Sequence, residues 1–425
     1  MSYQSRILDG ALDELFPHLA AIAIEGAKGV GKTTMARQRA ATVLDLTDPN
    51  QRLSVANNYD LITQVPPPIL IDEWQLEPSV WDRVRRAVDE DSSGGRFLLT
   101  GSAGVKPGVR IHSGAGRIVS FRLRPMSLVE RGIATPTVSL SSIVNAEVPK
   151  IQGTSQIDLP QYVDEILRSG FPGIRSLPDV AREAQLDGYI DRIVERELPI
   201  NDVVVRHPTI MKQWLSAYAA ATSTDATYSK ILDAATPGES NKPASATIIG
   251  YRDQLTRLFL LDPLEAWTPT FSPLNRLTKT PKHHLVDPAL AARIVGVGAS
   301  GLLQGGGVRV TSRPPTATWL GALFESLVVQ SVRVYAQAVR ASVGHLRTQN
   351  TQQEIDLILE GRDRNLVAIE IKASGSVTDH DVRHLNWLKA QLGDRVVDRI
   401  CINAGPHAYR RPDGVAVIPF ALLGP

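Results

Sequence analysis

A phosphate-binding motif near the amino terminus constrains the fold of this chain more than any other feature. The sequence reads Gly26-Ala27-Lys28-Gly29-Val30-Gly31-Lys32-Thr33, which matches the pattern G-x-x-x-x-G-K-[ST]. Residues 19–24 before it are apolar, as in a buried strand, and residues 33–44 after it are predicted as a helix. A glycine-rich turn between a strand and a helix can wrap its backbone N–H groups around a phosphate. The context therefore predicts a nucleotide-binding loop.

The chemistry of such a loop predicts ATP and Mg²⁺ as cofactors. The ammonium of Lys32 is expected to reach the β- and γ-phosphates, and the hydroxyl of Thr33 to ligate the Mg²⁺ between them. The predicted cofactor-binding residues are Gly26, Ala27, Lys28, Gly29, Val30, Gly31, Lys32, Thr33 and Thr34.

Two further strands end in polar residues of the kind that complete an ATPase site. Residues 68–73 are apolar until Asp72 and Glu73, which predicts Asp72 as a Mg²⁺ ligand and Glu73 as the base that polarises the attacking water. Two acids after a strand could also be a solvated strand end or the start of a helix. In residues 96–102, Thr100 or Ser102 could orient the water. Alternating strands and helices, including a helix over 79–89, predict a doubly wound parallel sheet.

These motifs resemble those of a prokaryotic AAA-type ATPase family. The resemblance is carried by the phosphate loop, Ile71-Asp72-Glu73-Trp74-Gln75, Leu99-Thr100-Gly101-Ser102, and Gly116-Arg117 followed by Arg124-Pro125-Met126-Ser127. It implies ATP binding and hydrolysis, with an ATPase core ahead of a C-terminal domain of unknown function. ATPases of this class often add an arginine that neutralises transition-state charge. The candidates are Arg110, Arg117 and Arg131, of which Arg117 is preferred because glycines flank it.

A chain of 425 residues exceeds what one hydrophobic core usually serves. We expect an ATPase domain over 1–135, a linker or lid over 136–160, a helical or winged-helix domain over 161–300 and a nuclease-like domain over 301–425. No apolar run is long enough for a membrane span and no signal peptide is evident, which predicts a cytoplasmic protein without a membrane partner. The net charge of +2 for the whole chain gives no argument for nucleic-acid binding.

The middle of the chain is predicted to be mostly helical, with a winged-helix order over 226–266. A short helix is followed by a turn, a second helix over 246–259 and an apolar stretch. Arg252 and Arg257, with Lys242 before the second helix, could place that helix in the major groove of DNA. The alternative is a helical packing module with ordinary surface charge.

The last segment carries charged residues on predicted strands. Residues 318–339 read as a helix with Glu325, and period-2 alternation puts Glu354 and Asp356 on one face of the strand over 354–359, opposite residues 355, 357 and 359. The same rule pairs Glu370 with Lys372 on the strand over 367–372. This order resembles the PD-(D/E)xK nuclease superfamily. The resemblance implies that Asp356 and Glu370 coordinate Mg²⁺ with support from Glu325, and that Lys372 positions the water. A domain that keeps the fold without cleavage is the alternative.

The sequence thus predicts an α/β protein in three parts: a parallel-sheet P-loop ATPase domain, a helical or winged-helix middle and a restriction-endonuclease-like C-terminal domain. The leading functional prediction is Mg²⁺-dependent ATP hydrolysis coupled to action on nucleic acid, with nuclease activity open. The alternative is a nucleotide-gated switch that binds a protein or DNA partner. Homo-oligomerisation is compatible with both.

Overall fold

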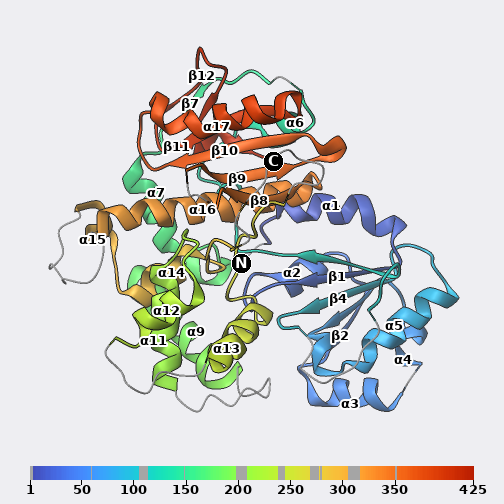
Figure 1. Ribbon diagram of the computed structural model, residues 1–425. Coiled ribbons are helices and arrows are strands. Elements are labelled where there is room, and N and C mark those ends of the chain that lie inside the picture. The colour runs from blue at the N-terminus through green and yellow to red at the C-terminus, as the bar shows by residue number, and fades with distance from the viewer. Residues whose placement is uncertain are drawn as a thin grey trace.

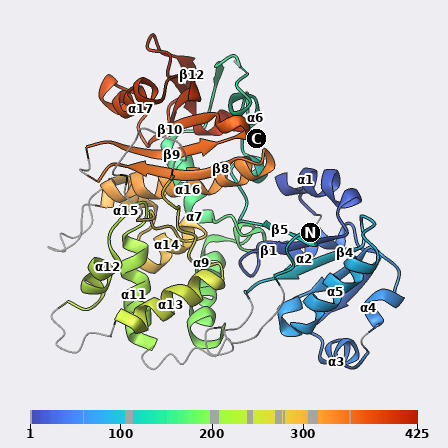
Figure 2. The ribbon, with the colours of Figure 1, turned by 45° about the vertical axis from the view of Figure 1, so that its right-hand side comes forward.

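The computed structural model describes residues 3–58, 60–104, 113–147, 149–197, 208–237, 245–268, 277, 280–304, 316–349 and 352–425. Figure 1 shows an amino-terminal α/β part in blue, a helical middle in green and yellow, and a C-terminal sheet in orange and red. The long helix α16 (Thr316–Ala338) lies between them and contacts helices and strands of all three parts (Figures 1 and 2).

The amino-terminal part is built on a five-stranded sheet in which every pairing is parallel. Its strand order is β2-β3-β4-β1-β5, so β4 lies between the strand before the phosphate loop and the strand that ends in Asp72. The strands are β1 (Ala21–Glu25), β2 (Thr42–Asp45), β3 (Ile69–Asp72), β4 (Phe97–Gly101) and β5 (Ile118–Arg122). Since β1, β3 and β4 are covered on both faces, they read as unbroken apolar runs. The predicted parallel sheet is confirmed.

The helices of this part follow the predicted pattern with one exception. They are α1 (Ile7–Leu15), α2 (Lys32–Arg37), α3 (Pro49–Asn57), α4 (Leu61–Gln64) and α5 (Ser79–Glu90). The helix predicted over 79–89 is confirmed, and its stripe of Val80, Val84, Ala87 and Val88 is buried. The helix predicted over 33–44 is wrong in its second half, because α2 ends at Arg37 and residues 42–45 form β2. The backbone N–H groups of Ala41 and Thr42 both bond the Pro68 carbonyl, which joins this stretch to the sheet.

The middle of the described chain is helical, as predicted. Its helices are α7 (Leu159–Arg168), α8 (Pro172–Arg175), α9 (Asp179–Arg192), the π-helical turn Ile193–Glu197, α11 (Pro208–Ala220), α12 (Tyr228–Ala235), α13 (Ser245–Arg257), α14 (Pro288–Val295) and α15 (Ala299–Gln304). After α13, antiparallel bridges join Leu261 to Leu285 and Leu264 to Lys282. Helices α12 and α13 lie where two helices were predicted over 226–266, but a winged helix at this place stays a prediction. Lys242 lies outside the described residues.

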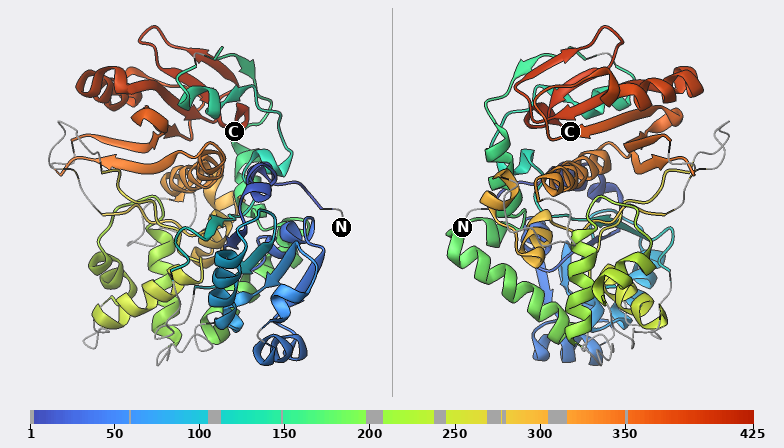
Figure 3. Two further views of the ribbon diagram at one scale, coloured as in Figure 1. Left: turned by 90° about the vertical axis from the view of Figure 1, so that its right-hand side faces the viewer. Right: turned by 60° about the vertical axis from the view of Figure 1, so that its left-hand side comes forward.

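The C-terminal part is a seven-stranded mixed sheet in the order β7-β12-β13-β11-β10-β9-β8. Strands β8, β9 and β10 are antiparallel neighbours, and β10, β11 and β13 are parallel. The strands are β7 (Gly153–Thr154), β8 (Ser342–Arg347), β9 (Glu354–Glu360), β10 (Leu366–Lys372), β11 (Val396–Asn403), β12 (His407–Arg410) and β13 (Ala416–Pro419). Helix α17 (Asp379–Leu392) covers one face of the sheet and α16 the other (Figure 3).

The alternation predicted for residues 354–359 is partly wrong. Leu357 and Leu359 pack toward α16, whereas Ile355 packs with the cluster under α17. The pairing of β8 with β9 shifts by one residue between Gly344 and Leu346, so β9 carries one extra residue there and its side chains change face. In β10 the alternation holds, with Val367, Ile369 and Ile371 facing α16.

Residues 136–160 were predicted as a linker or lid, but they lie against the C-terminal sheet. Strand β6 (Val138–Ser139) pairs with β14 (Leu423–Gly424), and β7 pairs with β12. The short helix α6 (Leu140–Val144) packs on β10, β11 and α16. The C-terminal part is therefore assembled from two stretches of chain that are far apart in sequence. The short elements β6, α6 and β7 are held in place by contacts with the strands of that part.

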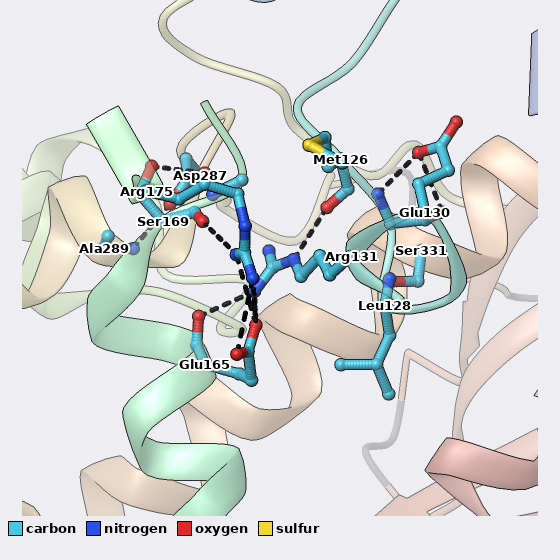
Figure 4. A network of polar contacts seen from close by, with 12 residues as sticks. Met126, Leu128, Glu130, Arg131, Glu165, Ser169, Arg175, Asp287, Ala289 and Ser331 are labelled. Atoms are coloured by element: carbon cyan, nitrogen blue, oxygen red, sulfur yellow. Dashed lines mark hydrogen bonds and ion pairs between the residues drawn. The ribbon is translucent and has the colours of Figure 1, made fainter. Parts of the chain in front are cut away.

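A buried polar network joins the amino-terminal part to the middle (Figure 4). The guanidinium of Arg131 donates to the carbonyls of Met126 at 2.9 Å and Glu165 at 2.6 Å. The Glu165 carboxylate also pairs with Arg175 at 3.2 Å. From α16, Ser331 accepts a hydrogen bond from the Leu128 backbone at 3.0 Å. Such satisfied charges in a low-dielectric interior hold the segments in one arrangement.

Candidate functional site

The phosphate loop lies at the carboxyl end of β1 in a conformation that only glycine adopts readily. Gly29 and Gly31 have φ values of +85° and +101°. A Cβ atom at Gly26 would lie 2.2 Å from the carbonyl oxygen of Leu123, which follows β5. The loop is therefore packed against the neighbouring strand, and α2 begins directly after it at Lys32.

The Lys32 ammonium is held against the loop itself. Its Nζ donates to the carbonyl oxygens of Gly26 at 2.8 Å and Ala27 at 3.0 Å, and the residue is 4% exposed. Burial lowers the pKa of Lys32 to about 8, an effect that the carboxylates of Glu73 and Asp72 oppose. The side chain thus keeps its positive charge at neutral pH in a site shielded from water.

Three side chains meet beside the loop: Thr33 from the start of α2, Asp72 from the end of β3 and Thr100 from near the end of β4. The hydroxyl of Thr33 donates to Oδ1 of Asp72 at 2.8 Å, and the hydroxyl of Thr100 donates to the same oxygen. Asp72 is 5% exposed and Thr100 is fully buried. Because β3 and β4 are adjacent and parallel, their carboxyl ends lie at one edge of the sheet with the loop. Hydroxyl and carboxylate oxygens are ligands that suit Mg²⁺.

Glu73 is held in place by two donors. Ser102 donates to its Oε2 at 2.6 Å, and the amide of Gln75 donates to the same oxygen. Its backbone has φ +54°, a left-handed conformation that costs about 1–3 kcal/mol for a residue with a side chain. The ring of the following Trp74 packs against Trp81 of α5 at a tilt of 36°, with ring centroids 4.6 Å apart. The strained backbone is thus supported by packing, and it fixes the direction of the carboxylate.

Two cavities flank the phosphate loop. One of about 680 Å³ is lined by loop residues Lys28 and Gly29, by Ser102, and by residues of the middle including Tyr189, Arg192 and Arg196. The other, of about 400 Å³, is lined by Tyr3, Gln4, Val30, Gly31, Thr34 and Pro172, among others. Both volumes are of the size that takes a small-molecule ligand.

The middle contacts the phosphate loop directly. Tyr189 donates to the Lys28 carbonyl at 3.1 Å, and the Lys28 ammonium lies 2.9 Å from Oε1 of Glu197. Arg192 and Arg196 come from the same stretch, and sequence reasoning missed both. No motif marks them, because a helical turn far along the chain brings them to the cavity.

The arginines considered from the sequence lie elsewhere. Arg117 precedes β5, at the opposite edge of the sheet from the loop, and a five-residue strand spans about 17 Å. It pairs with Asp89 at 2.8 Å. Arg117 is therefore far from its own loop, and its action on the loop of a neighbouring copy stays a prediction. The guanidinium of Arg131 is buried in the network of Figure 4, where it bonds Met126 and Glu165. Arg110 lies outside the described residues.

The predicted C-terminal centre is also brought together, but with a residue that the sequence did not suggest. Asp356 on β9 and Glu325 on α16 both contact the ammonium of Lys282, at 2.8 Å and 3.0 Å. Glu370 pairs with Lys372 at 2.6 Å, on the opposite face of β10 from the side chains packed on α16. In the described part of the chain, no group of three or more His, Cys, Asp or Glu residues has a geometry that could hold a metal ion.

The charges of this centre balance without a metal. Burial alone would lower the pKa of Lys282, but the carboxylates of Asp356, Glu325 and Glu354 raise it well above its ordinary value. Burial likewise opposes the charged form of Asp356, yet Lys282 and Lys372 hold its pKa below the usual range. Burial raises the pKa of Glu325 to about 8 and that of Glu370 to about 8, which favours their neutral forms. The arrangement does not fit the Mg²⁺ site predicted from Glu325, Asp356 and Glu370.

The comparisons with known proteins divide the chain in the same way. Residues 19–131 match the family model described as "AAA domain". Residues 19–131 form an AAA-type P-loop ATPase domain. Residues 159–301 and 320–423 match two domains of unknown function, DUF8612 and DUF4143. The match to the AAA domain, together with the loop and Asp72, supports nucleotide binding and hydrolysis by this part of the chain.

Proteins of similar sequence occur in mycobacteria. The chain is 26% identical over 411 residues to the uncharacterized proteins Rv2008c of Mycobacterium tuberculosis and Mb2031c of Mycobacterium bovis, covering 94% of this chain and 79% of each relative. Among solved structures, the Walker-type ATPase PABY2304 of Pyrococcus abyssi is similar at 15% identity with a TM-score of 0.38, covering 67% of this chain and 94% of that one. Within the described residues, no helix is long and apolar enough to cross a membrane.

Proposed function

We propose that the AAA domain hydrolyses ATP with Mg²⁺ and that this turnover changes how the helical middle contacts a macromolecular partner. The observation that carries the first half is the meeting of Thr33, Asp72 and Thr100 beside the phosphate loop. Thr33 and Asp72 would hold the Mg²⁺, which would neutralise charge on the β- and γ-phosphates.

The residues of this chain then have separate roles in turnover. Lys32, now bonded to the carbonyls of Gly26 and Ala27, would exchange them for phosphate oxygens. Glu73 would polarise the attacking water in the direction that Ser102 and Gln75 set for it. Thr100 would orient Asp72. Arg192 or Arg196, at the rim of the larger cavity, would offset charge that develops on the transferred phosphoryl group.

The two cavities suggest how ATP lies along the loop. Ser102 bonds Glu73 and lines the larger cavity, so this side faces the γ-phosphate. The smaller cavity contains Thr34 and Gly31 but none of the residues that touch Glu73, which leaves it for the nucleoside. Tyr3 and Pro172 there offer flat apolar surfaces to a base.

The test of this ATPase is the substitution Lys32→Ala. Loss of the only side chain expected to bridge the β- and γ-phosphates should lower phosphate release from ATP by about 10²–10³-fold. Release should also require Mg²⁺ and stop with a chelator. Lys230→Ala, on the exposed surface of α12, is the matched control and should keep turnover. Equal turnover in the two variants would remove the proposal.

The link from ATP to the middle starts at Glu73. Ser102 bonds Glu73, and two residues on, the Gly104 backbone donates to the carbonyl of Arg257 at the end of α13, at 3.1 Å. A change at the γ-phosphate therefore has a short covalent and hydrogen-bonded route to α13. The helix order of this segment favours nucleic acid as the partner, and a protein partner is the alternative.

A substitution of Arg252 can distinguish a nucleic-acid partner from a protein partner. It lies 4.9 Å over the Tyr228 ring and pairs with Asp253 on the outer side of α13, whereas Arg257 touches the loop at Gly104. If the partner is duplex DNA, Arg252→Glu should weaken binding in a mobility-shift assay by about tenfold, because a phosphate contact is reversed in charge. ATP should alter the affinity. No shift by the wild-type chain at low salt would favour the protein partner.

A Mg²⁺-dependent nuclease in the C-terminal part receives less support. The convergence of Asp356 and Glu370 with Lys372 is what favours it. Against it stands Lys282, whose ammonium contacts the carboxylates that cleavage would need for metal. We therefore propose that the C-terminal part does not cleave nucleic acid, which is the alternative in which a nuclease-like domain has no catalytic activity.

A further inference from the structure

The acidic centre of the C-terminal part already contains a cation of its own. The ammonium of Lys282 lies 2.8 Å from Asp356, 3.0 Å from Glu325 and 3.1 Å from Glu354. These carboxylates come from β9 and α16, while Lys282 comes from the ladder that follows α13. The lysine side chain is 2% exposed, so water does not compete for it. The contact is therefore a cluster of three acidic side chains around one buried ammonium, and it joins two parts of the chain.

The backbone keeps Lys282 in this place. Its N–H donates to the Leu264 carbonyl and its carbonyl accepts from Leu264, each at 2.9 Å. Next to this pair, the ladder continues onto β8, because Trp267 donates to the His345 carbonyl at 2.7 Å and His345 donates to Glu265 at 3.0 Å. Moving the ammonium out of the cluster would require breaking this ladder.

A divalent metal ion has no place among the same oxygens. Mg²⁺ and Ca²⁺ bind oxygen at about 2.0–2.6 Å, so an ion shared by Asp356 and Glu325 would lie almost on the Lys282 nitrogen. Two cations at such a distance in a buried site repel each other strongly. The other acid of the predicted metal pair, Glu370, is bonded to Lys372. Each acid of that pair thus has one carboxyl oxygen bonded to a lysine.

We propose that Lys282 is the resident cation of this centre, where it takes the place of a metal ion and fastens the helical middle to the C-terminal sheet. The centre is a structural junction that binds no divalent metal. This assignment is independent of ATP turnover in the AAA domain, because none of its residues touches the phosphate loop.

The first test uses the nucleotide-free chain and compares wild type with Asp356→Asn. Binding of Mn²⁺ is measured by calorimetry and by electron paramagnetic resonance. Any binding at Asp72 is common to both chains and cancels in the comparison. We expect identical Mn²⁺ binding. Wild-type binding that Asp356→Asn abolishes would overturn the proposal, whatever happens to other variants.

The second test removes the lysine. Lys282→Met should lower the melting temperature, because three acidic side chains lose the ammonium that they share. Mn²⁺ should bind this variant at least tenfold more tightly than wild type. In Lys282→Met/Asp356→Asn the melting temperature should partly recover and the Mn²⁺ response should disappear. Lys389→Met, on α17 and 37% exposed, is the control for loss of a lysine. A Lys282→Met variant that had the wild-type melting temperature and bound Mn²⁺ no more tightly than wild type would contradict the proposed junction.

Discussion

Replacing Glu73 with glutamine should lower ATP turnover by about 10²–10⁴-fold and leave ATP binding unchanged. The reason is that an amide has the shape of the carboxylate but cannot accept the proton of the attacking water. The hydrogen bonds from Ser102 and Gln75 can be kept, because the amide oxygen accepts both. The variant should therefore hold ATP in the geometry of the wild-type site.

Two measurements on the same samples separate binding from chemistry. Phosphate release reports turnover, and titration with a fluorescent ATP analogue reports the dissociation constant. Glu90→Gln, at the exposed end of α5, changes the charge by the same amount away from the loop and should affect neither. If Glu73→Gln turned over ATP at the wild-type rate, the base would have to be another residue. If the Glu73→Gln variant lost ATP binding instead, Glu73 would contribute to the binding of ATP and not only to the chemical step.

The second large effect is expected on stability. Asp262 is 4% exposed and pairs with Arg124 at 2.8 Å, Arg333 at 3.0 Å and Arg122 at 3.3 Å. The arginines come from the end of β5, the residues after it, and α16. Asp262→Asn would leave three guanidinium groups without their buried counter-charge. We expect the free energy of unfolding to fall by about 3–5 kcal/mol, as for other broken buried ion pairs.

The pH dependence of this effect follows from the direction of the pKa shift. Burial opposes the charged form of Asp262, but the three arginines outweigh it and hold its pKa far below the ordinary value. A lowered native pKa contributes stability above the pKa of the unfolded chain, about 3.9, and that contribution declines as the pH falls below it. Urea titrations should thus show a constant gap between wild type and variant from pH 6 to 8 and a smaller gap near pH 3.

The control for Asp262 is an exposed acid in an ion pair. Asp253 pairs with Arg252 at 2.7 Å, but its side chain is 53% exposed. Solvent screens such a pair, so Asp253→Asn should change stability by at most about 1 kcal/mol. A similar small effect for Asp262→Asn would show that the three arginines find other partners or water when the carboxylate is lost.

The residues of the AAA domain were predictable because the rules that bring them together are local. A glycine-rich motif between a strand and a helix defines the loop, and parallel pairing places the ends of β1, β3 and β4 at one edge. Thr33, Asp72 and Thr100 therefore could be expected to meet, and the structure brings them together.

The remaining features depend on contacts between distant segments. Lys282 carries no motif, and only the packing of the ladder on β8 and β9 takes it to Asp356. Arg192 and Arg196 reach the cavity because Tyr189 and Glu197 attach their helical turn to the loop. The extra residue in β9 has no signal in the sequence, and it puts Ile355 on the opposite face from Leu357 and Leu359.

Helix α16 has a practical consequence for dissecting the protein into fragments. Ser331 and Tyr335 accept from the backbone N–H groups of Leu128 and Val129. Glu325, earlier in the same helix, accepts from Lys282, which also contacts Asp356 of the C-terminal sheet. A fragment that ends before residue 316 would leave those backbone N–H groups without their hydrogen-bond acceptors. It would also expose the apolar surface that α16 covers. Expression of the isolated parts should therefore give insoluble protein. Deletion of the coding sequence for either the amino-terminal or the C-terminal part should have the same effect as deletion of the whole gene.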